Sequence, residues 1–97
     1  MRVLITGAGG FLGGNLAKYI AQEGCEVYTL GSKPVSGPNH FFLDTPINKK
    51  TIHDTLSKVK PNLIFHCAGT TNQKAILDAF YVNTFYASFI LKSLDNL

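Results

Sequence analysis

The chain has 97 residues and a formal net charge of +3. Hydrophobic residues make up 45% of it and charged residues 15%, a composition typical of one small globular domain and not of a disordered segment. The basic residues are scattered apart from Lys49-Lys50, and no apolar run approaches the about 20 residues of a membrane span, so we expect neither nucleic-acid nor membrane binding. We expect no metal site, because the spacing of Cys25, Cys67 and the three histidines does not suit metal ligands. No secretory signal precedes the first apolar run, which predicts a protein of the reducing cytoplasm.

The first part of the chain predicts a buried strand, a glycine-rich turn and a helix. Residues 2–6 form a short, β-branched apolar run, and a helical pattern follows over 11–23 and stops at Gly24. This layout presents backbone N–H groups and a positive helix N-terminus to a pyrophosphate. The apolar stripe of the predicted helix consists of Phe11, Leu12, Leu16, Ala17 and Ile20.

Three glycines in this turn have separate expected roles. Gly7 permits the tight turn after the strand, Gly10 lets a phosphate approach the backbone, and Gly13 lets the helix pack close to the sheet. Their spacing is one residue longer at the front than the dinucleotide fingerprint Gly-x-Gly-x-x-Gly. The alternative is a glycine-rich turn without a ligand, but the strand before it and the helix after it favour a dinucleotide site.

The rest of the chain alternates between strand and helix signals, which indicates an α/β fold with a parallel sheet. Right-handed crossovers then predict a partial, Rossmann-like sheet of strand order 3-2-1-4 with helices on both faces, and a ligand crevice between strands one and four. Pro61 ends the second helix. The further elements are strands over 26–30, 40–43 and 62–66 and helices over 47–59 and 73–95.

The segment from Thr6 to Gly13, Thr-Gly-Ala-Gly-Gly-Phe-Leu-Gly, resembles the opening of the extended short-chain dehydrogenases/reductases. This group contains NAD(P)-dependent nucleotide-sugar epimerases, dehydratases and reductases. The resemblance implies a Rossmann sheet with the cofactor over its carboxyl edge. It assigns cofactor binding to Gly7, Gly10, Phe11, Leu12 and Gly13, with the amide groups of residues 8–12 facing the diphosphate.

The end of the second predicted strand bears on the choice of dinucleotide. A carboxylate there would bind the ribose hydroxyls and select NAD, but Leu30 is followed by Gly31, Ser32 and Lys33. A hydroxyl and an ammonium next to a small residue leave room for a 2′-phosphate and neutralise its charge. We therefore favour NADP over NAD as the cofactor, with NAD as the alternative. The alternative is that Ser32 and Lys33 only begin a solvated loop.

Asp44 and Thr45 follow the third predicted strand. In the resembled family an aspartate here accepts a hydrogen bond from the adenine amino group, a role that suits an acceptor-only carboxylate. The next residues in that family line the adenine ring. The alternative is structural, because either residue before Pro46 could cap the second helix. One aspartate can serve both purposes.

Two later segments also resemble the family. Cys67, Ala68 and Gly69 follow His66 as in the family's His-x-Ala-Ala or His-x-Ala-Gly, where small residues let the backbone approach the cofactor. We interpret His66 as a packed, hydrogen-bonded histidine and not as a catalytic base. Asn83 matches the family's Asn-Val-x-Gly-Thr-x-x-Leu-Leu and is implied to support the loop near the nicotinamide, although Thr84, Tyr86 and Ala87 depart from that pattern.

The family's catalytic pair, Tyr-x-x-x-Lys, has no counterpart, because no tyrosine of this sequence has a lysine four residues later. We therefore expect residues 1–97 to be the N-terminal half of an NAD(P)-binding domain, inactive by itself, from a parent that transfers hydride on a sugar nucleotide. The alternatives are a non-catalytic NAD(P)-binding sensor or scaffold and a structural remnant. The last helix is apolar on almost every side, which favours a homo-oligomer.

Overall fold

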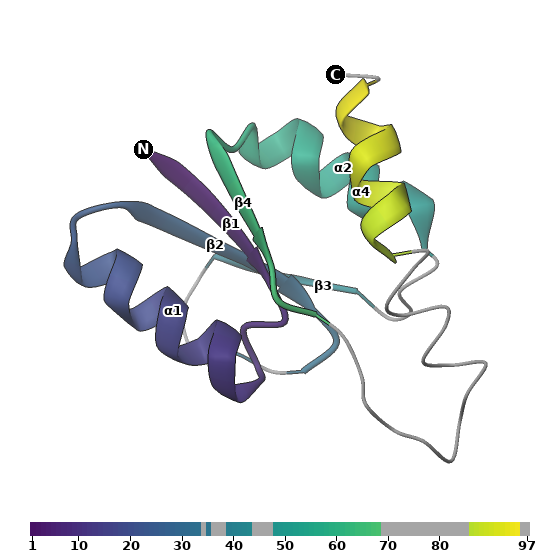
Figure 1. Ribbon diagram of the computed structural model, residues 1–97. Helices are drawn as coiled ribbons and strands as arrows, with labels where there is room; N and C mark the ends of the chain where they lie inside the picture. Colours follow the sequence, from purple (N-terminus) through teal and green to yellow (C-terminus); the bar gives the residue numbers. More distant parts are fainter. Residues whose placement is uncertain (34, 36–38, 44–47, 69–85, 96–97) are drawn as a thin grey trace, which may run out of the picture.

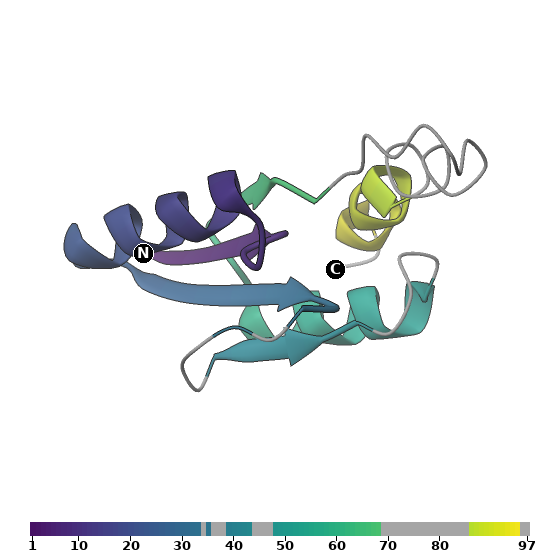
Figure 2. The same ribbon diagram turned by 90° about the horizontal axis from the view of Figure 1, so that it is seen from below.

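The computed structural model describes residues 1–33, 35, 39–43, 48–68 and 86–95 (Figure 1). Its sheet is parallel and has the order β3-β2-β1-β4. The four strands are β1 (Arg2–Thr6), β2 (Glu26–Gly31), β3 (His40–Phe42) and β4 (Leu63–His66), and they all run in the same direction (Figure 2). The predicted fold class and strand order are confirmed.

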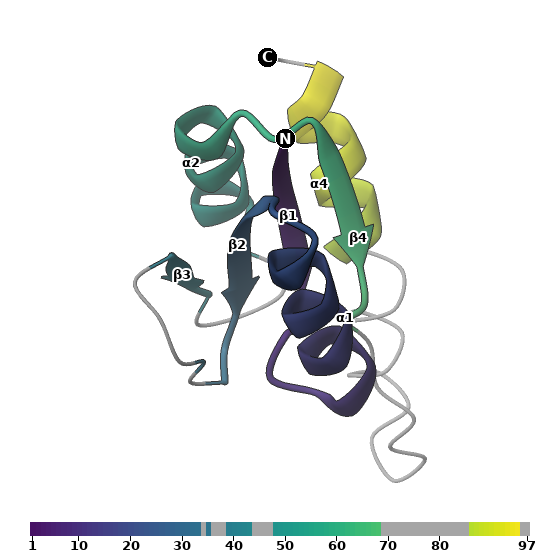
Figure 3. The same ribbon diagram turned by 90° about the vertical axis from the view of Figure 1, so that its left-hand side faces the viewer.

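Helices cover both faces of the sheet, as expected. Helix α1 (Phe11–Gln22) lies on one face, while α2 (Lys49–Val59) and α4 (Tyr86–Asp95) lie together on the other (Figure 3). Alternate residues of a strand point to opposite faces, and β1 follows that rule with Val3 and Ile5 toward α1 and Leu4 toward α2. The buried residues on the α2 side are Leu4, Leu30, Leu43, Ile52, Leu56 and Ile90.

Helix α1 begins at the predicted residue and ends in a Schellman motif. Gly24 has a φ of +88°, and its N–H bonds to the carbonyl of Ala21 while the N–H of Cys25 bonds to that of Ile20. The predicted apolar stripe is wrong at its start, because Phe11 is 89% and Leu12 68% exposed. These residues form the first turn, beyond the edge of the sheet, so the inward face consists of Gly13, Leu16, Ala17 and Ile20.

Helix α2 begins later than the sequence indicated. Its N-cap is Asn48, whose side-chain oxygen accepts from Thr51 N–H at 3.1 Å. The suggestion that Asp44 or Thr45 caps this helix is therefore wrong, since Asn48 is the N-cap residue and its side chain makes the capping hydrogen bond. At the other end Lys60 adopts the left-handed conformation before Pro61, where the prediction placed the end.

The remaining boundaries agree within about two residues with those predicted. Leu43 follows β3 but is buried, and its N–H bonds to the carbonyl of Gly31 at 3.0 Å. Of the helix predicted over 73–95, the structure describes residues 86–95, which are helical, and the part before them lies outside the described residues. In α4 Ile90 and Ser93 are buried while Leu91 and Leu94 are exposed.

Gly7 and Gly10 differ in backbone conformation, and replacing each of them tests the fold. Gly7→Ala should lower the free energy of unfolding by about 1–2 kcal/mol because the backbone at Gly7 is left-handed, with a φ of +73°. Overpacking should add about 1–3 kcal/mol, because the added Cβ would lie 2.6 Å from Ala68 N. The matched control, Gly10→Ala, should cost at most about 1 kcal/mol, since the added Cβ would meet Gly7 O at 3.4 Å. Urea unfolding of both variants measures the difference, and equal losses would contradict this account.

Candidate functional site

The glycine-rich turn lies at the carboxyl edge of the sheet, between the ends of β2 and β4. Gly7 N–H bonds to the carbonyl of Leu30 at 3.3 Å, and Cys67 N–H bonds to the carbonyl of Thr6 at 3.1 Å. In parallel α/β sheets this edge, next to the strand where the winding reverses, is where ligands bind. The winding of the sheet reverses at β1, because β2 and β3 are added on one side of β1 and β4 is added on the other.

No side chain forms a capping hydrogen bond with the backbone N–H groups at the N-terminus of α1. Its N-cap is Gly10, which makes no side-chain cap hydrogen bond, and its first turn contains no acidic residue. The first backbone N–H groups of a helix have no carbonyl within the helix to bond to, and here they belong to Phe11 and Leu12. By contrast, Asn48 caps α2. The start of α1 therefore offers free donors and a positive dipole end to an anion.

The three glycines of the motif differ in what the protein demands of them. An added Cβ at Gly7 would lie 2.6 Å from Ala68 N, and one at Gly13 would lie 2.7 Å from the carbonyl carbon of Gly7. These two positions need glycine for close backbone packing. Gly10 is exposed, and its φ of −89° suits any residue. The fold therefore does not explain a glycine at this position, whereas close approach of a ligand would.

A hydrogen-bond group joins the ends of β1 and β4 beside the turn. Thr6 and His66 are in register, with Thr6 Oγ1 and His66 Nδ1 at 2.6 Å, and Ala68 N–H donates to the same Oγ1 at 3.2 Å. A ring with its proton on Nε2 lets the hydroxyl donate to Nδ1 while its oxygen accepts from Ala68. The interpretation of His66 as a hydrogen-bonded residue agrees with the structure, but the expectation that it is packed is wrong, because His66 is exposed at the end of the edge strand β4.

Burial acts on both titratable side chains of the β4 end. It lowers the pKa of His66 below 6.5 although the side chain is partly open to solvent, and it raises the pKa of the Cys67 thiol. The neutral imidazole is therefore favoured, which matches its role as an acceptor from Thr6. Cys67 stays a thiol at neutral pH and packs with the apolar cluster of the α1 side.

Lys33 lies directly beside the glycine turn. An added Cβ on Gly9 would be 2.6 Å from the Cβ of Lys33 and 3.2 Å from its Cδ, so the lysine side chain runs over Gly9. Ser32 and Lys33 are both exposed where β2 ends. Leu30 and Gly31 complete the strand without a carboxylate. A hydroxyl and a cation thus stand next to the glycine-rich turn.

The structure brings most of the predicted site residues to this one edge. They are Gly7, Gly10, Phe11, Leu12, Gly13, Ser32, Lys33, Cys67 and Ala68. Four further predicted residues, Asp44, Thr45, Gly69 and Asn83, lie outside the described residues. Sequence reasoning missed Thr6 and Gly9. The position of Thr6 at the end of the first predicted strand was a signal for a role at the site. Its hydrogen-bond partners could not be predicted, because they depend on the register of β1 with β4.

In the described residues, no group of three or more His, Cys, Asp or Glu side chains is arranged to hold a metal ion. None of the helices in that part of the chain combines the length and apolar character needed to cross a membrane.

Titration of His66 should make stability depend on pH. Because its pKa is lower in the folded state, the unfolded chain binds the proton first as the pH falls, so the free energy of unfolding should decrease below pH about 6.5 and level off below the folded-state pKa. His66→Asn keeps an acceptor for Thr6 and removes the titration, so urea midpoints between about pH 7 and pH 5 should fall less than in the wild type. His40→Asn serves as the control, and a pH dependence unchanged by His66→Asn would refute the assignment.

Three solved structures share the fold of this chain. The UDP-glucose 4-epimerase of Thermus thermophilus in complex with NAD superposes with a TM-score of 0.86 at 23% identity, over 96% of this chain and 33% of that chain. The dTDP-4-dehydrorhamnose reductase of Bacillus anthracis in complex with NADP gives 0.75 at 25%, over 95% and 31%. The UDP-glucose 4-epimerase of Thermotoga maritima with UDP-glucose gives 0.83 at 19%, over 96% and 33%.

This chain therefore spans about a third of the length of those proteins. The matched third carries the glycine-rich turn and the carboxyl edge described above. A family model described as "NAD dependent epimerase/dehydratase family" matches residues 3–91, which is nearly the whole sequence. The turn, the strand order and this match agree, and the chain belongs to the NAD-dependent epimerase/dehydratase family.

Proposed function

We propose that this chain binds the adenosine diphosphate portion of an NAD(P) cofactor and forms residues 1–97 of its binding domain, as the N-terminal half. The observation that carries the proposal is the uncapped N-terminus of α1, where Gly10 is exposed and an added Cβ would meet only the carbonyl oxygen of Gly7, at 3.4 Å. A diphosphate would accept from the N–H groups of Phe11 and Leu12 and would neutralise the positive helix end.

The other residues of the edge would shape and bound the cofactor site. Gly7 and Gly13 hold α1 close enough to β1 for the turn to reach the phosphates. Cys67 and Ala68 would wall the site from the side of β4, held by Thr6. By their resemblance to the family, Asp44 and Thr45 would contact adenine, and Gly69 and Asn83 would line the path toward nicotinamide.

We favour NADP over NAD for this chain. The support comes from Ser32 and Lys33, which take the place of a carboxylate at the end of β2, and from the lysine side chain that runs over Gly9. An ammonium here would pair with a 2′-phosphate next to the diphosphate turn. The solved relatives leave the choice open, because the Thermus structure contains NAD and the Bacillus structure NADP.

The parent activity that we infer is hydride transfer on a nucleotide sugar, by an epimerase, dehydratase or reductase. The bound cofactor would supply the hydride chemistry, while the residues described here bind and orient its adenosine end. The Thermotoga relative, crystallised with UDP-glucose, supports a sugar nucleotide as the second ligand. The 97 residues contain no Tyr-x-x-x-Lys pair, so we expect no turnover from them alone.

We also propose that the chain self-associates or packs against further protein through β4 and α4. Leu63 on β4 is 43% exposed, and Leu91 and Leu94 on α4 are 65% and 40% exposed. Strand β4 ends the described sheet with an open edge, which favours pairing with another strand.

Replacement of Gly10 tests the proposed phosphate site. Gly10→Ala should bind NADP about tenfold or more weakly, equivalent to about 1.4 kcal/mol, because a methyl group would stand where the diphosphate approaches. Isothermal titration with NADP, NAD and AMP measures the loss. The stability of this variant, followed by urea unfolding, separates lost binding from lost folding. Wild-type affinity in a folded Gly10→Ala protein would refute the site.

Replacement of Lys33 tests the preference for NADP. Lys33→Gln should weaken NADP binding about tenfold, since a charge-assisted bond to phosphate is lost, and leave NAD binding nearly unchanged. Lys58→Gln on α2 removes the same charge from an exposed position away from the turn and serves as the matched control. Equal losses for both dinucleotides, or a wild-type preference for NAD, would show that Lys33 does not read the 2′-phosphate.

A further inference from the structure

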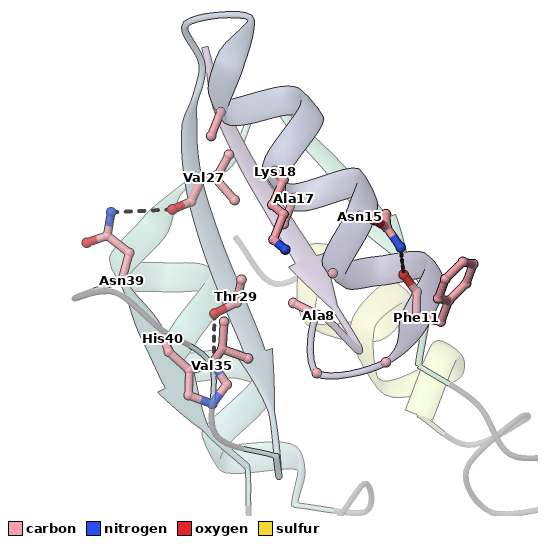
Figure 4. A pocket seen from close by; sticks show the side chains of 14 residues that line it. Ala8, Phe11, Asn15, Ala17, Lys18, Val27, Thr29, Val35, Asn39 and His40 are labelled. Carbon is pink, nitrogen blue, oxygen red and sulfur yellow. Dashed lines mark hydrogen bonds between the residues drawn. The ribbon is translucent and has the colours of Figure 1, made fainter.

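A groove of about 550 Å³ adjoins the glycine turn, with Gly9 and Gly10 in its lining, and extends from there along α1. It runs between α1 and the strands β2 and β3, with Ala17 and Lys18 on one wall and Val27, Thr29 and His40 on the other (Figure 4). The connection over residues 32–39 is shorter than the about a dozen residues of a helical crossover. The groove therefore lies on sheet surface that a crossover helix would otherwise cover.

The walls of this groove are mainly small and apolar. They are provided by Ala8, Ala17, Ala21, Val27 and Val35. A pocket of this size with apolar walls and a few convergent polar groups is the usual form of a small-molecule site, for which volumes of about 300–1,000 Å³ are typical.

Most polar side chains of the groove have partners within the protein. Asn15 Nδ2 donates to Phe11 O at 2.7 Å, and Asn39 Nδ2 donates to Val27 O at 3.3 Å. Thr29 Oγ1 lies 2.7 Å from His40 Nδ1. These bonds fix the walls in place, and they leave Lys18 and the second ring nitrogen of His40 as the groups that a ligand can engage.

His40 Nε2 is the one side-chain polar atom in the described residues that is buried and has no hydrogen-bond partner. Such an atom normally bonds to protein, water or a ligand, because a buried polar group without a partner costs stability. The ring is held by its register partner Thr29 on β2, so Nε2 keeps a fixed place in the wall of the groove.

The charges of the groove indicate the sign of its ligand. Lys18 contributes a cation from α1, and no acidic residue is among the described residues that line the groove. We propose that this groove is a second ligand site, separate from the dinucleotide site, for a small carboxylate with a flat apolar body. The body would lie between Ala17 and Val27, the carboxylate would pair with Lys18, and a ligand polar atom would bond to His40 Nε2.

Chemical-shift mapping of the ¹⁵N-labelled 97-residue chain with 2-naphthoate tests this site. We expect saturable shifts for the amides of Ala17, Lys18, Val27 and His40. The neutral analogue 2-naphthamide should bind about fivefold more weakly, which is the scale of one exposed charge pair. Shifts that do not saturate, or equal affinity for the two compounds, would overturn the proposal.

Two variants and one competitor sharpen the test. Ala21→Leu should fill the groove and abolish the shifts, and Lys18→Gln should reduce the affinity for 2-naphthoate to that for 2-naphthamide, whereas Lys58→Gln should change neither. Saturating NADP should leave 2-naphthoate binding in place. Displacement by NADP, with shifts centred on Leu12, Cys67 and Ala68, which do not line the groove, would overturn a separate site. Binding of 2-naphthoate in a chain that binds no dinucleotide would uphold the groove and refute the proposed function alone.

Discussion

The close approach of α1 to the end of β1 is the constraint on which the rest of the site depends. It exists because Gly7 and Gly13 have no side chains: a Cβ on Gly13 would collide with the backbone of Gly7, and a Cβ on Gly7 would collide with that of Ala68. The first turn of α1 is thereby brought to the carboxyl edge of the sheet. Its unpaired N–H groups face outward there, where a side-chain cap would otherwise satisfy them.

The same contact joins three strands at one point. The turn is bonded to the carbonyl of Leu30 on β2, while Thr6 on β1 holds the residues after β4 through its backbone and its hydroxyl. A change at any of these positions would move the others, because the backbone atoms are already in contact and cannot adjust separately. The pairing of Thr6 with His66 further favours a neutral ring, so the arrangement couples to pH through burial of one histidine.

The two recesses of the molecule arise from different causes. The carboxyl edge is open because the winding of the sheet reverses at β1, which any sheet of this order provides. The groove beside it lies along α1, where β2 and β3 are joined by fewer residues than a helical crossover needs. The first recess gathers backbone donors and Lys33, and the second gathers small apolar side chains with Lys18 and an unpaired ring nitrogen. Their chemistry therefore suits different ligands, although both adjoin Gly9 and Gly10.

Much of the fold could be predicted because local patterns and glycine spacing follow from short-range physics. The continuous apolar run of Val3, Leu4 and Ile5 before a turn after Thr6 predicts a buried strand, and right-handed crossovers then leave few sheet orders. The exposed Phe11 and Leu12 were misread because periodicity gives the direction of a side chain around a helix but not where the sheet beneath it ends. The start of α2 was misplaced because several residues with capping side chains stand before it, and only the structure shows that Asn48 makes the capping hydrogen bond.

By itself, the sequence determined the strand-turn-helix motif, the α/β class and the residue types of the glycine-rich turn, since each depends on neighbours within a few positions. The tertiary structure decided which glycines the fold needs, how Thr6 meets His66 and Ala68, and that a groove lies along α1. These features join residues about sixty positions apart or opposite walls of one recess. Only the register of parallel strands and the packing of helices on them bring such groups together.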